Sequence, residues 1–416
     1  MEIILSDQQQ EFADDIFEKY KAKTHGLVLL DSFAGSGKTT VVKWCLDKFI
    51  QPNDYSILSP TNKACSLYQP EYETQTLHQF FRWMRGGYDD NGNLSPQFKG
   101  SLQHYPVLFI DECSMIDQEL FNLILGEAHR SLVILLGDSK QLNPVKNNNT
   151  SPVFTFVDYL SKHDFSVNYR ILDSDITSVI SQCREQSCTT NLNFDMVPLI
   201  TVRDLVPKFH EMDQNGKAVL IACSNDQVSK MNSFIRRKVY RYTDSIVLGE
   251  KLIFTGKRGC CTSTANNHVL SADCSGVEYT TGDEISIVQI HSRSVTLQNE
   301  LIEFYIIRDQ NDIEWYYAKD KVAFESVAKK AKMNAVRSRS SRQWAKYYEF
   351  METYCPDLKH RYAITAYKAQ GSQYDAVFVD INNIITCRSR MNPECTTREI
   401  YTAVSRARSL VMKIQY

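Results

Sequence analysis

Short apolar runs, each followed by a polar or glycine-containing cluster, recur along the first third of the chain. They occupy residues 27–30, 55–58, 107–110 and 132–136. Apolar runs of this length, without strict alternation, are typical of strands buried on both faces of a sheet. Helical spacing follows the first run, and the repeated order of strand, polar cluster and helix predicts a doubly wound, parallel α/β sheet.

A second α/β unit is predicted later in the chain, and a β-rich segment interrupts it. An apolar run at 218–222 precedes a helical pattern at 227–240, and further strands are expected at 376–380 and 410–414. Between these parts, short β-type runs separated by Gly, Asn and Asp turns predict a small antiparallel barrel. The runs lie at residues 251–254, 284–290, 294–297, 303–307 and 314–317.

These patterns predict three domains. The first occupies residues 1–180, the second occupies 181–245 and 356–416, and the inserted barrel with a basic helical segment occupies 246–355. A hairpin is expected within the first domain, at about 80–105, because an Asp-Asn-Gly turn at 90–92 separates two short runs. This hairpin carries aromatic residues, among them Phe98, and both a presented aromatic side chain and an ordinary packed hairpin fit the pattern.

The segment Ser32–Thr40, SFAGSGKTT, stands between the first apolar run and the helical pattern that follows it. This context favours a phosphate-binding loop over a simple Gly-rich turn. Gly35 and Gly37 allow the backbone N–H groups to point inward, Lys38 can reach the β- and γ-phosphates, and the Thr39 hydroxyl can bind Mg²⁺. Ser32 replaces the glycine that usually opens the pattern. The candidate ATP-binding residues of this loop are Ala34, Gly35, Ser36, Gly37, Lys38, Thr39 and Thr40.

An acidic pair, Asp111 and Glu112, ends the apolar run at 107–110. Asp111 is a candidate Mg²⁺ ligand, and Glu112 is a candidate for polarising an attacking water molecule. The next apolar run leads to Gln141, which could sense a γ-phosphate; an ordinary Asp/Ser turn is the alternative.

Three further residues are candidates for contacts with ATP. Gln9 could read the adenine edge, or it could complete a capping box with Ser6 at the start of the first helix. Arg170 is a candidate arginine finger, because a permanently charged, forked guanidinium suits the charge of a phosphoryl transition state. Taken alone, this residue fits an ordinary surface role better. Arg406 is a second candidate finger.

Composition narrows the function classes. The 416 residues carry a formal net charge of −2, so any nucleic-acid surface must be local. The stretch 329–346 contains no acidic residue and is either such a surface or a solvated helix face. The 12 Cys form no CxxC pair, which predicts free thiols in a reducing cytoplasm rather than a zinc or disulfide scaffold. Neither a signal peptide nor a membrane-spanning segment is expected.

Eight short motifs occur in an order that resembles the superfamily 1 helicases, most of all their 5′-to-3′ branch of RecD- and Dda-like enzymes. They are AGSGKTT, LSPTNKA, TLHQFF, IDECSM, LLGDSKQLNPV, NYR, TAYKAQGS and YTAVSRAR. The resemblance implies two RecA-like domains with ATP and Mg²⁺ between them, a β-hairpin pin and an SH3-like barrel. It gives catalytic roles to Lys38, Glu112, Gln141, Arg170 and Arg406, and adds Gly371 to the ATP-binding residues.

The resemblance also implies a path for single-stranded DNA across both domains. The candidate contacts are Thr61, Lys63, His78, Phe98, Thr365, Lys368 and Gln370. The Lys-x-Gln-Gly-Ser form of residues 368–372 matches the 5′-to-3′ enzymes, whereas Tyr367 replaces the His common in this branch. Phe98 is the candidate wedge of the pin, because base stacking on one aromatic ring is worth about 1–3 kcal/mol.

The sequence therefore predicts an ATP-dependent 5′-to-3′ DNA helicase. Two alternatives remain open: an ATP-regulated binding switch or translocase that does not unwind, and an RNA-directed helicase. Single-stranded and forked DNA are the expected partners, and replication or single-strand-binding proteins are candidate partners. A monomer in the bacterial cytoplasm, such as that of a phage-infected host, is expected by analogy.

Overall fold

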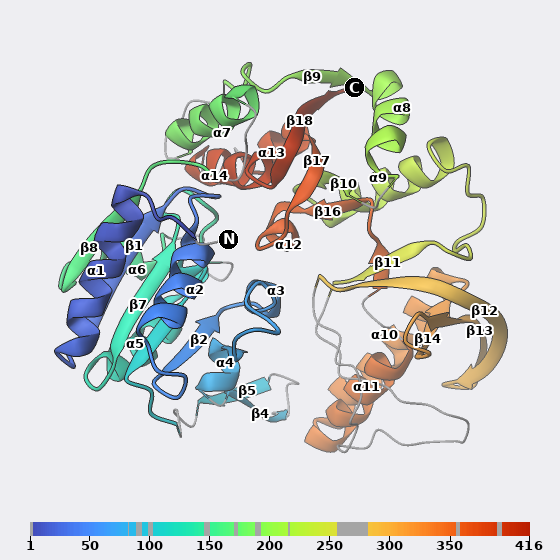
Figure 1. Cartoon of the computed structure of the whole chain (residues 1–416). Coiled ribbons are helices and arrows are strands. Elements are labelled where there is room, and N and C mark those ends of the chain that lie inside the picture. The colour runs from blue at the N-terminus through green and yellow to red at the C-terminus, as the bar shows by residue number, and fades with distance from the viewer. Residues whose placement is uncertain are drawn as a thin grey trace. The chain divides into compact units, whose positions relative to one another are not determined.

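The computed structural model describes most of the chain (Figure 1). The described residues are 3–81, 83–88, 94–98, 103–144, 150–169, 174–187, 193–214, 217–255, 282–354, 358–388 and 393–416. The chain forms two compact units. Unit 1 comprises Met1–Arg82, Lys99–Met231 and Tyr362–Tyr416, and unit 2 comprises Trp83–Phe98 and Asn232–Arg361.

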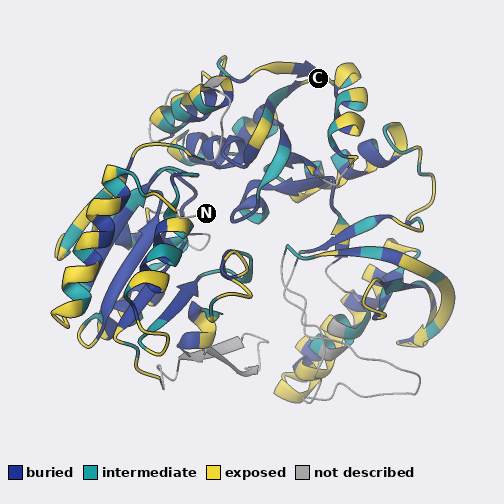
Figure 2. Ribbon diagram, in the orientation of Figure 1, coloured by how far each residue is buried: buried dark blue, intermediate teal, exposed yellow. Residues whose placement is uncertain are grey.

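The first sheet of unit 1 has six parallel strands in the order β3-β2-β6-β7-β1-β8. The strands are β1 (Gly26–Ser32), β2 (Tyr55–Ser59), β3 (Thr74–Thr76), β6 (Val107–Ile110), β7 (Leu132–Gly137) and β8 (Ser161–Phe165). Every residue of β6 and β7 is buried, as Figure 2 shows by the dark blue of the sheet. This agrees with the doubly wound sheet that the apolar runs predict, because both faces of such a sheet are covered.

Helices cover the first sheet. They are α1 (Asp7–Lys21), α2 (Lys38–Lys48), α3 (Asn62–Cys65), α4 (Leu77–Phe80), α5 (Gln118–Ala128) and α6 (Pro152–Thr155), with a 3₁₀ turn at Cys113–Met115. Phe12 and Ile16 of α1 pack with Val41 and Cys45 of α2 against one face of the strands. The capping box between Ser6 and Gln9 at the start of α1 is confirmed.

The second sheet of unit 1 has five parallel strands in the order β16-β10-β17-β18-β9. They are β9 (Leu199–Thr201), β10 (Ala218–Ala222), β16 (Ala363–Thr365), β17 (Tyr374–Val379) and β18 (Ala407–Gln415). The helices of this half are α7 (Ser174–Gln186), α8 (Val202–Met212), α9 (Asn225–Lys238), α12 (Ala366–Ala369), α13 (Ile381–Arg388) and α14 (Pro393–Val404). The two parallel sheets flanked by helices have the arrangement of a RecA-like α/β fold.

Unit 2 contains a five-stranded antiparallel sheet in the order β14-β13-β12-β11-β15. Its elements are β11 (Lys251–Phe254), β12 (Glu284–Leu297), β13 (Glu300–Asp309), β14 (Glu314–Ala318), β15 (Leu358–His360), α10 (Lys321–Ser338) and α11 (Ser341–Tyr354). Among the described strands, β14 and β15 stand at the edges, so closure into an SH3-like barrel stays a prediction. A second core, which includes Phe304 and Phe324, packs α10 against the sheet.

One expectation for unit 2 needs correction. The runs at 284–290 and 294–297 are one strand, β12, because its pairing with β13 is unbroken from Gln289 to Leu297, after a bulge between Ile287 and Gln289. The basic stretch at 329–346 is helical on both sides of Arg339, whose left-handed conformation ends α10 before α11 begins.

A pair of antiparallel strands, β4 (Trp83–Tyr88) and β5 (Leu94–Phe98), occupies the position of the expected hairpin. The turn at 90–92 lies outside the described residues. Within unit 2, β4 lies against α11. Whether these strands act as a pin therefore stays a prediction.

The domain boundaries also stay predictions. The expected boundary at 180 falls inside α7, and this helix lies against α14 and β18 of the second half.

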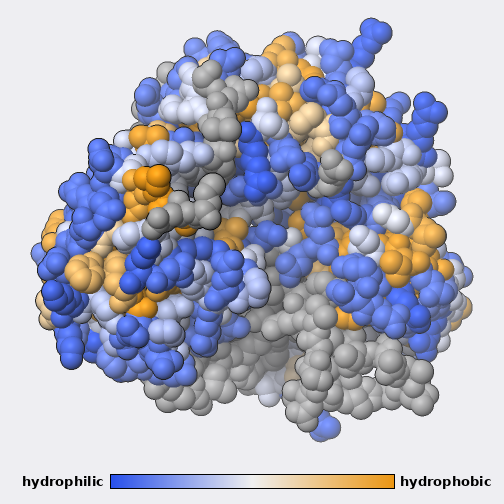
Figure 3. Space-filling view, in the orientation of Figure 1, coloured by the Kyte–Doolittle hydropathy of each residue, from blue (hydrophilic) through white to orange (hydrophobic). Residues whose placement is uncertain are grey.

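On the face shown in Figure 3, hydrophilic side chains predominate and apolar residues form separate small patches. Among the described helices, none is long and apolar enough to span a membrane.

Candidate nucleotide and nucleic-acid site

The candidate phosphate loop joins a strand to a helix N-terminus. Strand β1 ends at Ser32 and α2 begins at Lys38. Gly35 and Gly37 have φ angles of 87° and 86°, a left-handed conformation that glycine adopts without strain. Left-handed residues that alternate with right-handed ones turn successive backbone N–H groups toward one point, as an anion site requires. The backbone of the loop is therefore suited to a phosphate group.

Two segments that are distant from this loop in sequence donate hydrogen bonds to its carbonyl groups. The Gln9 side chain donates from Nε2 to the Ser36 carbonyl at 3.0 Å, and the Tyr169 backbone N–H donates to the Gly35 carbonyl at 2.9 Å. A Cβ atom added to Gly37 would lie 2.4 Å from Gln9 Nε2. Gln9 therefore contacts the loop directly, in addition to capping its own helix.

The polar side chains of the loop have few protein partners. Lys38 Nζ donates to the Phe33 carbonyl at 3.3 Å, a bond that a phosphate could replace. Ser36 Oγ is fully buried and has no hydrogen-bond partner among the described residues. A buried polar atom without a partner costs free energy, so a ligand that supplies one is favoured. These two side chains fit a bound nucleotide.

The acidic pair lies at the end of β6, in the first sheet. Asp111 is 4% exposed, and its two carboxylate oxygens accept from Tyr68 Oη at 2.9 Å and from the Glu112 backbone N–H at 2.8 Å. Burial raises the pKa of Asp111, and the neighbouring Glu112 charge raises this pKa further. Burial raises the pKa of Tyr68, and the nearby Thr39 side chain opposes that rise. The hydroxyl of Thr39 and the carboxylate of Asp111 both offer the oxygen ligands that Mg²⁺ prefers.

Gln141 lies beyond the end of β7, where the two halves of unit 1 meet. Its Nε2 donates to Asp138 Oδ2 at 3.3 Å, while its Oε1 is buried without a partner among the described residues. Arg398 of α14 donates to the Gln141 carbonyl at 3.2 Å and also to the Ser139 carbonyl. The segment that carries the candidate γ-phosphate sensor is therefore held by the second half.

The two candidate arginine fingers are not placed at the phosphate loop by any contact described here. Arg406 is 3% exposed and bonds within its own segment, from Nε to the Thr402 carbonyl at 3.1 Å and from a terminal nitrogen to Ser405 Oγ at 2.9 Å. Arg170 lies outside the described residues, next to the Tyr169 whose backbone reaches the loop. Both finger roles stay predictions.

The nucleic-acid candidates of the first half lie on two short helices. Thr61 is the N-cap of α3, and its Oγ1 accepts from the Ala64 N–H at 3.2 Å. A hydroxyl that accepts this bond can still donate its proton to a phosphate. Lys63 is half-buried on α3, and His78 is exposed on α4.

The candidates of the second half lie at α12 and in the turn after it. Thr365 is the N-cap of α12 and Lys368 stands in its last turn. Gln370 is 5% exposed and donates from Nε2 to Ser114 Oγ, beside the acidic pair, at 3.4 Å. A Cβ atom on Gly371, whose φ is 77°, would lie 3.7 Å from Lys63 Cγ. Candidates from both halves therefore meet within unit 1, while Phe98 ends β5 in unit 2 and its side chain is not described.

Two family models match the chain. The model of the AAA domain covers residues 18–147, and that of the UvrD-like helicase C-terminal domain covers residues 360–412. The first match contains the phosphate loop, and the second contains α12 and α14. The chain resembles a superfamily 1 helicase.

Individual relatives agree with this resemblance. The chain is 25% identical over 275 residues to the ATP-dependent DNA helicase dda of Enterobacteria phage T4, a match covering 60% of each protein. It thus spans less than two thirds of that helicase. An uncharacterised protein of Acanthamoeba polyphaga mimivirus, R530, is 21% identical over 494 residues, covering 97% of this chain and 98% of its own.

Solved helicase structures share the fold. A Pif1 helicase from Bacteroides, in complex with ADP-AlF3 and single-stranded DNA, has a TM-score of 0.54 at 15% identity, covering 99% of this chain and 92% of its own. Pif1 helicase from Candida albicans has a TM-score of 0.51 at 14% identity, and the match covers 100% of this chain and 95% of the Pif1 chain. At these identities the likeness concerns the fold alone.

Three side chains at this helicase-like site were not predicted from the sequence. Tyr68 bonds Asp111, and Tyr401 and Arg184 contact Asp138. Tyr401 belongs to a recognised motif, YTAVSRAR, but nothing in the pattern singles out its hydroxyl. Arg184 and Tyr68 lie outside every motif, so only the three-dimensional structure brings them to the site.

Proposed function

We propose that the chain is an ATP-dependent DNA helicase that moves 5′-to-3′ along single-stranded DNA and separates duplex strands. One observation carries the proposal: Gln370, which follows α12, contacts Ser114 beside the acidic pair, and Arg398 of α14 holds the Gln141 segment. An ATP site built in this way can couple hydrolysis to relative movement of the two halves. The phage relative is named an ATP-dependent DNA helicase, which supports the same activity.

The chemistry follows from the side chains at the loop. Lys38 leaves the Phe33 carbonyl to bind the β- and γ-phosphates, and Glu112 orients the attacking water. Thr39 and Asp111 would hold Mg²⁺, which when bound neutralises charge on the phosphate oxygens. Gln141 responds to the γ-phosphate, and Arg406 and Arg170 stabilise the transition-state charge after closure.

Directed movement requires that the two halves grip the strand alternately. Thr61, Lys63 and His78 bind phosphates in one half, and Thr365, Lys368 and Gln370 bind in the other. The contact of Gln370 with Ser114 supports a link between this track and the acidic pair, because a shift of one moves the other. The 5′-to-3′ direction rests on the Lys-x-Gln-Gly-Ser form of residues 368–372. Phe98 is proposed as the wedge at the fork.

The proposal is tested by ATP hydrolysis at saturating ATP, measured alone, with single-stranded DNA and with single-stranded RNA of the same sequence. We expect DNA to raise the rate about 10-fold or more, because strand binding favours the closed, catalytic arrangement. A larger effect of RNA would favour an RNA track. Equal rates in all three samples would contradict a nucleic-acid motor.

A further inference from the structure

One phenol hydroxyl lies at the junction of the phosphate loop, the Gln141 segment and the second half of unit 1. Tyr401, on α14, is fully buried, and its Oη donates to Asp138 Oδ2 at 2.5 Å. Burial raises the pKa of this hydroxyl, and the nearby Arg184 charge and Ala34 backbone oppose that rise. Three segments that are distant in sequence therefore lie around one hydroxyl group.

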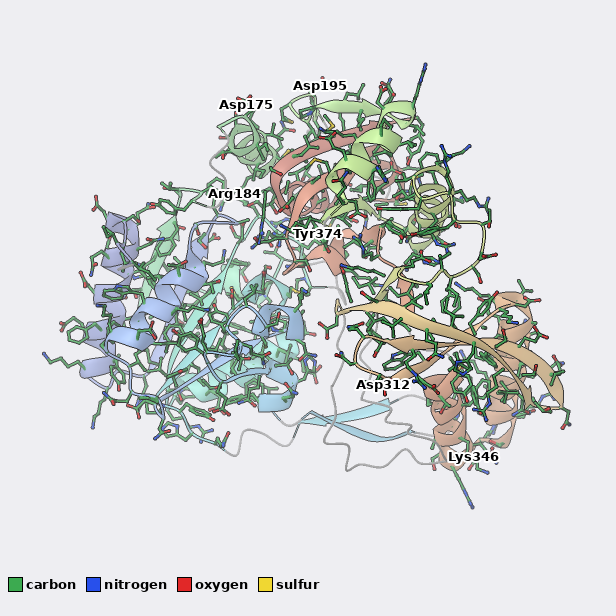
Figure 4. The ribbon with its side chains drawn as sticks, turned by 45° about the vertical axis from the view of Figure 1, so that its right-hand side comes forward. Asp175, Arg184, Asp195, Asp312, Lys346 and Tyr374 are labelled. Atoms are coloured by element: carbon green, nitrogen blue, oxygen red, sulfur yellow. The ribbon has the colours of Figure 1, made fainter. Side chains whose placement is uncertain are left out.

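Arg184 completes this junction from α7. Its guanidinium lies 3.5 Å from Asp138 Oδ1 and stacks on the Phe33 ring, with 4.2 Å between the guanidinium carbon and the ring centroid. Figure 4 shows this side chain extending from α7 toward the first half. Arg184 thus contacts the phosphate loop through Phe33 and the Gln141 segment through Asp138.

Asp138 is the acceptor that these contacts share. It is 1% exposed, and it also accepts from Gln141 Nε2 at 3.3 Å and from the Lys140 backbone N–H at 3.0 Å. A buried carboxylate is stable only while its charge and lone pairs are satisfied, so its position follows its donors. Any shift of Tyr401 is therefore transmitted through Asp138 to the side chain of Gln141.

We propose that Tyr401 and Arg184 are positioning residues that couple the nucleotide site to movement of the second half, by holding Asp138 and through it Gln141. The inference rests on the proposed function, since it assigns a role within the same ATP-driven cycle. Neither side chain needs to touch ATP. When the second half moves, the Tyr401 hydroxyl moves with α14 and Arg184 moves with α7, so Phe33 of the loop and Gln141 respond together.

The first test is Tyr401→Phe, which removes only the hydroxyl. We expect the DNA-stimulated kcat for ATP to fall about 10-fold or more while the KM for ATP changes less than about 3-fold, because the loss lies in coupling and not in nucleotide binding. The stoichiometry of ATP hydrolysed per base pair separated should rise. A role limited to general stability would not separate kcat from KM in this way.

A matched control is Tyr416→Phe. Tyr416 also donates its hydroxyl to a carboxylate, Asp380, but this pair lies wholly within the second half and has no described contact with the phosphate loop. The DNA-stimulated kcat of Tyr416→Phe should remain within about 2-fold of the wild-type value.

Arg184→Lys is the second test variant, to be used if Tyr401→Phe does not fold. Lysine keeps the charge but loses the planar fork and the stacking on Phe33, so the same selective fall in kcat is expected. Folded variants at both positions with wild-type kcat and coupling would overturn the inference. Failure of the proposed function looks different, because the wild type itself would then show no DNA stimulation.

Discussion

Replacing Lys38 with alanine is expected to lower ATP hydrolysis about 100-fold or more, with or without DNA. Lys38 begins α2 at the end of the phosphate loop, and its only described hydrogen bond is to the Phe33 carbonyl. The ammonium group is therefore available for the β- and γ-phosphates, where charge develops in the transition state. Losing one such preorganised charge costs about 10²–10³ in kcat.

The measurement is steady-state ATP hydrolysis on folded protein, with Lys43→Ala as the control. Lys43 lies on the same helix and pairs with Glu71 on the surface, at 2.7 Å. Exposed pairs of this kind contribute about 0–1 kcal/mol, so Lys43→Ala should keep its activity and stability. Hydrolysis by Lys38→Ala at the wild-type rate would show that the loop is not the catalytic ATP site.

Replacing Glu112 with glutamine is expected to separate nucleotide binding from hydrolysis. The amide has nearly the same size but cannot accept a proton or polarise water as a carboxylate does. Loss of a general base costs about 10²–10⁴ in rate. Because Lys38, Thr39 and the loop backbone are unchanged, the dissociation constant for ATP should change by less than about 3-fold.

Nucleotide binding can be followed by fluorescence of a labelled ATP analogue, and hydrolysis by phosphate release. Glu11→Gln is a suitable control, because Glu11 is exposed on α1. An equal loss of binding and hydrolysis in Glu112→Gln would instead indicate a structural role.

Most strands of the two parallel sheets of unit 1 were predictable because local patterns encode them. Residues 107–110 and 132–136 are apolar throughout, and the structure confirms both as buried strands. Strand β8 has the polar sequence SKHDF, which no apolar pattern marks. It is stabilised from α1 instead, where Asp15 accepts from Ser161 at 2.6 Å and lies 2.9 Å from His163 Nε2.

The candidate site was predictable as motifs but not as contacts. Thr39 and Asp111 are each marked by their sequence neighbours, whereas Tyr68, which hydrogen-bonds to Asp111, is not. The same holds for Tyr401 and Asp138, which are 263 positions apart. Contacts between such distant positions depend on how the two sheets pack, and a local pattern carries no information on that packing.

Strand displacement with ATP and Mg²⁺ on two partial duplexes, one with a 5′ single-stranded tail and one with a 3′ tail, tests the proposed helicase activity. We expect the wild-type protein to open the 5′-tailed duplex alone, and Lys38→Ala to open neither. Opening of the 3′-tailed duplex alone would contradict the direction assigned to residues 368–372. If neither duplex opened while single-stranded DNA still stimulated ATP hydrolysis, the chain would be a translocase or binding switch and not a helicase.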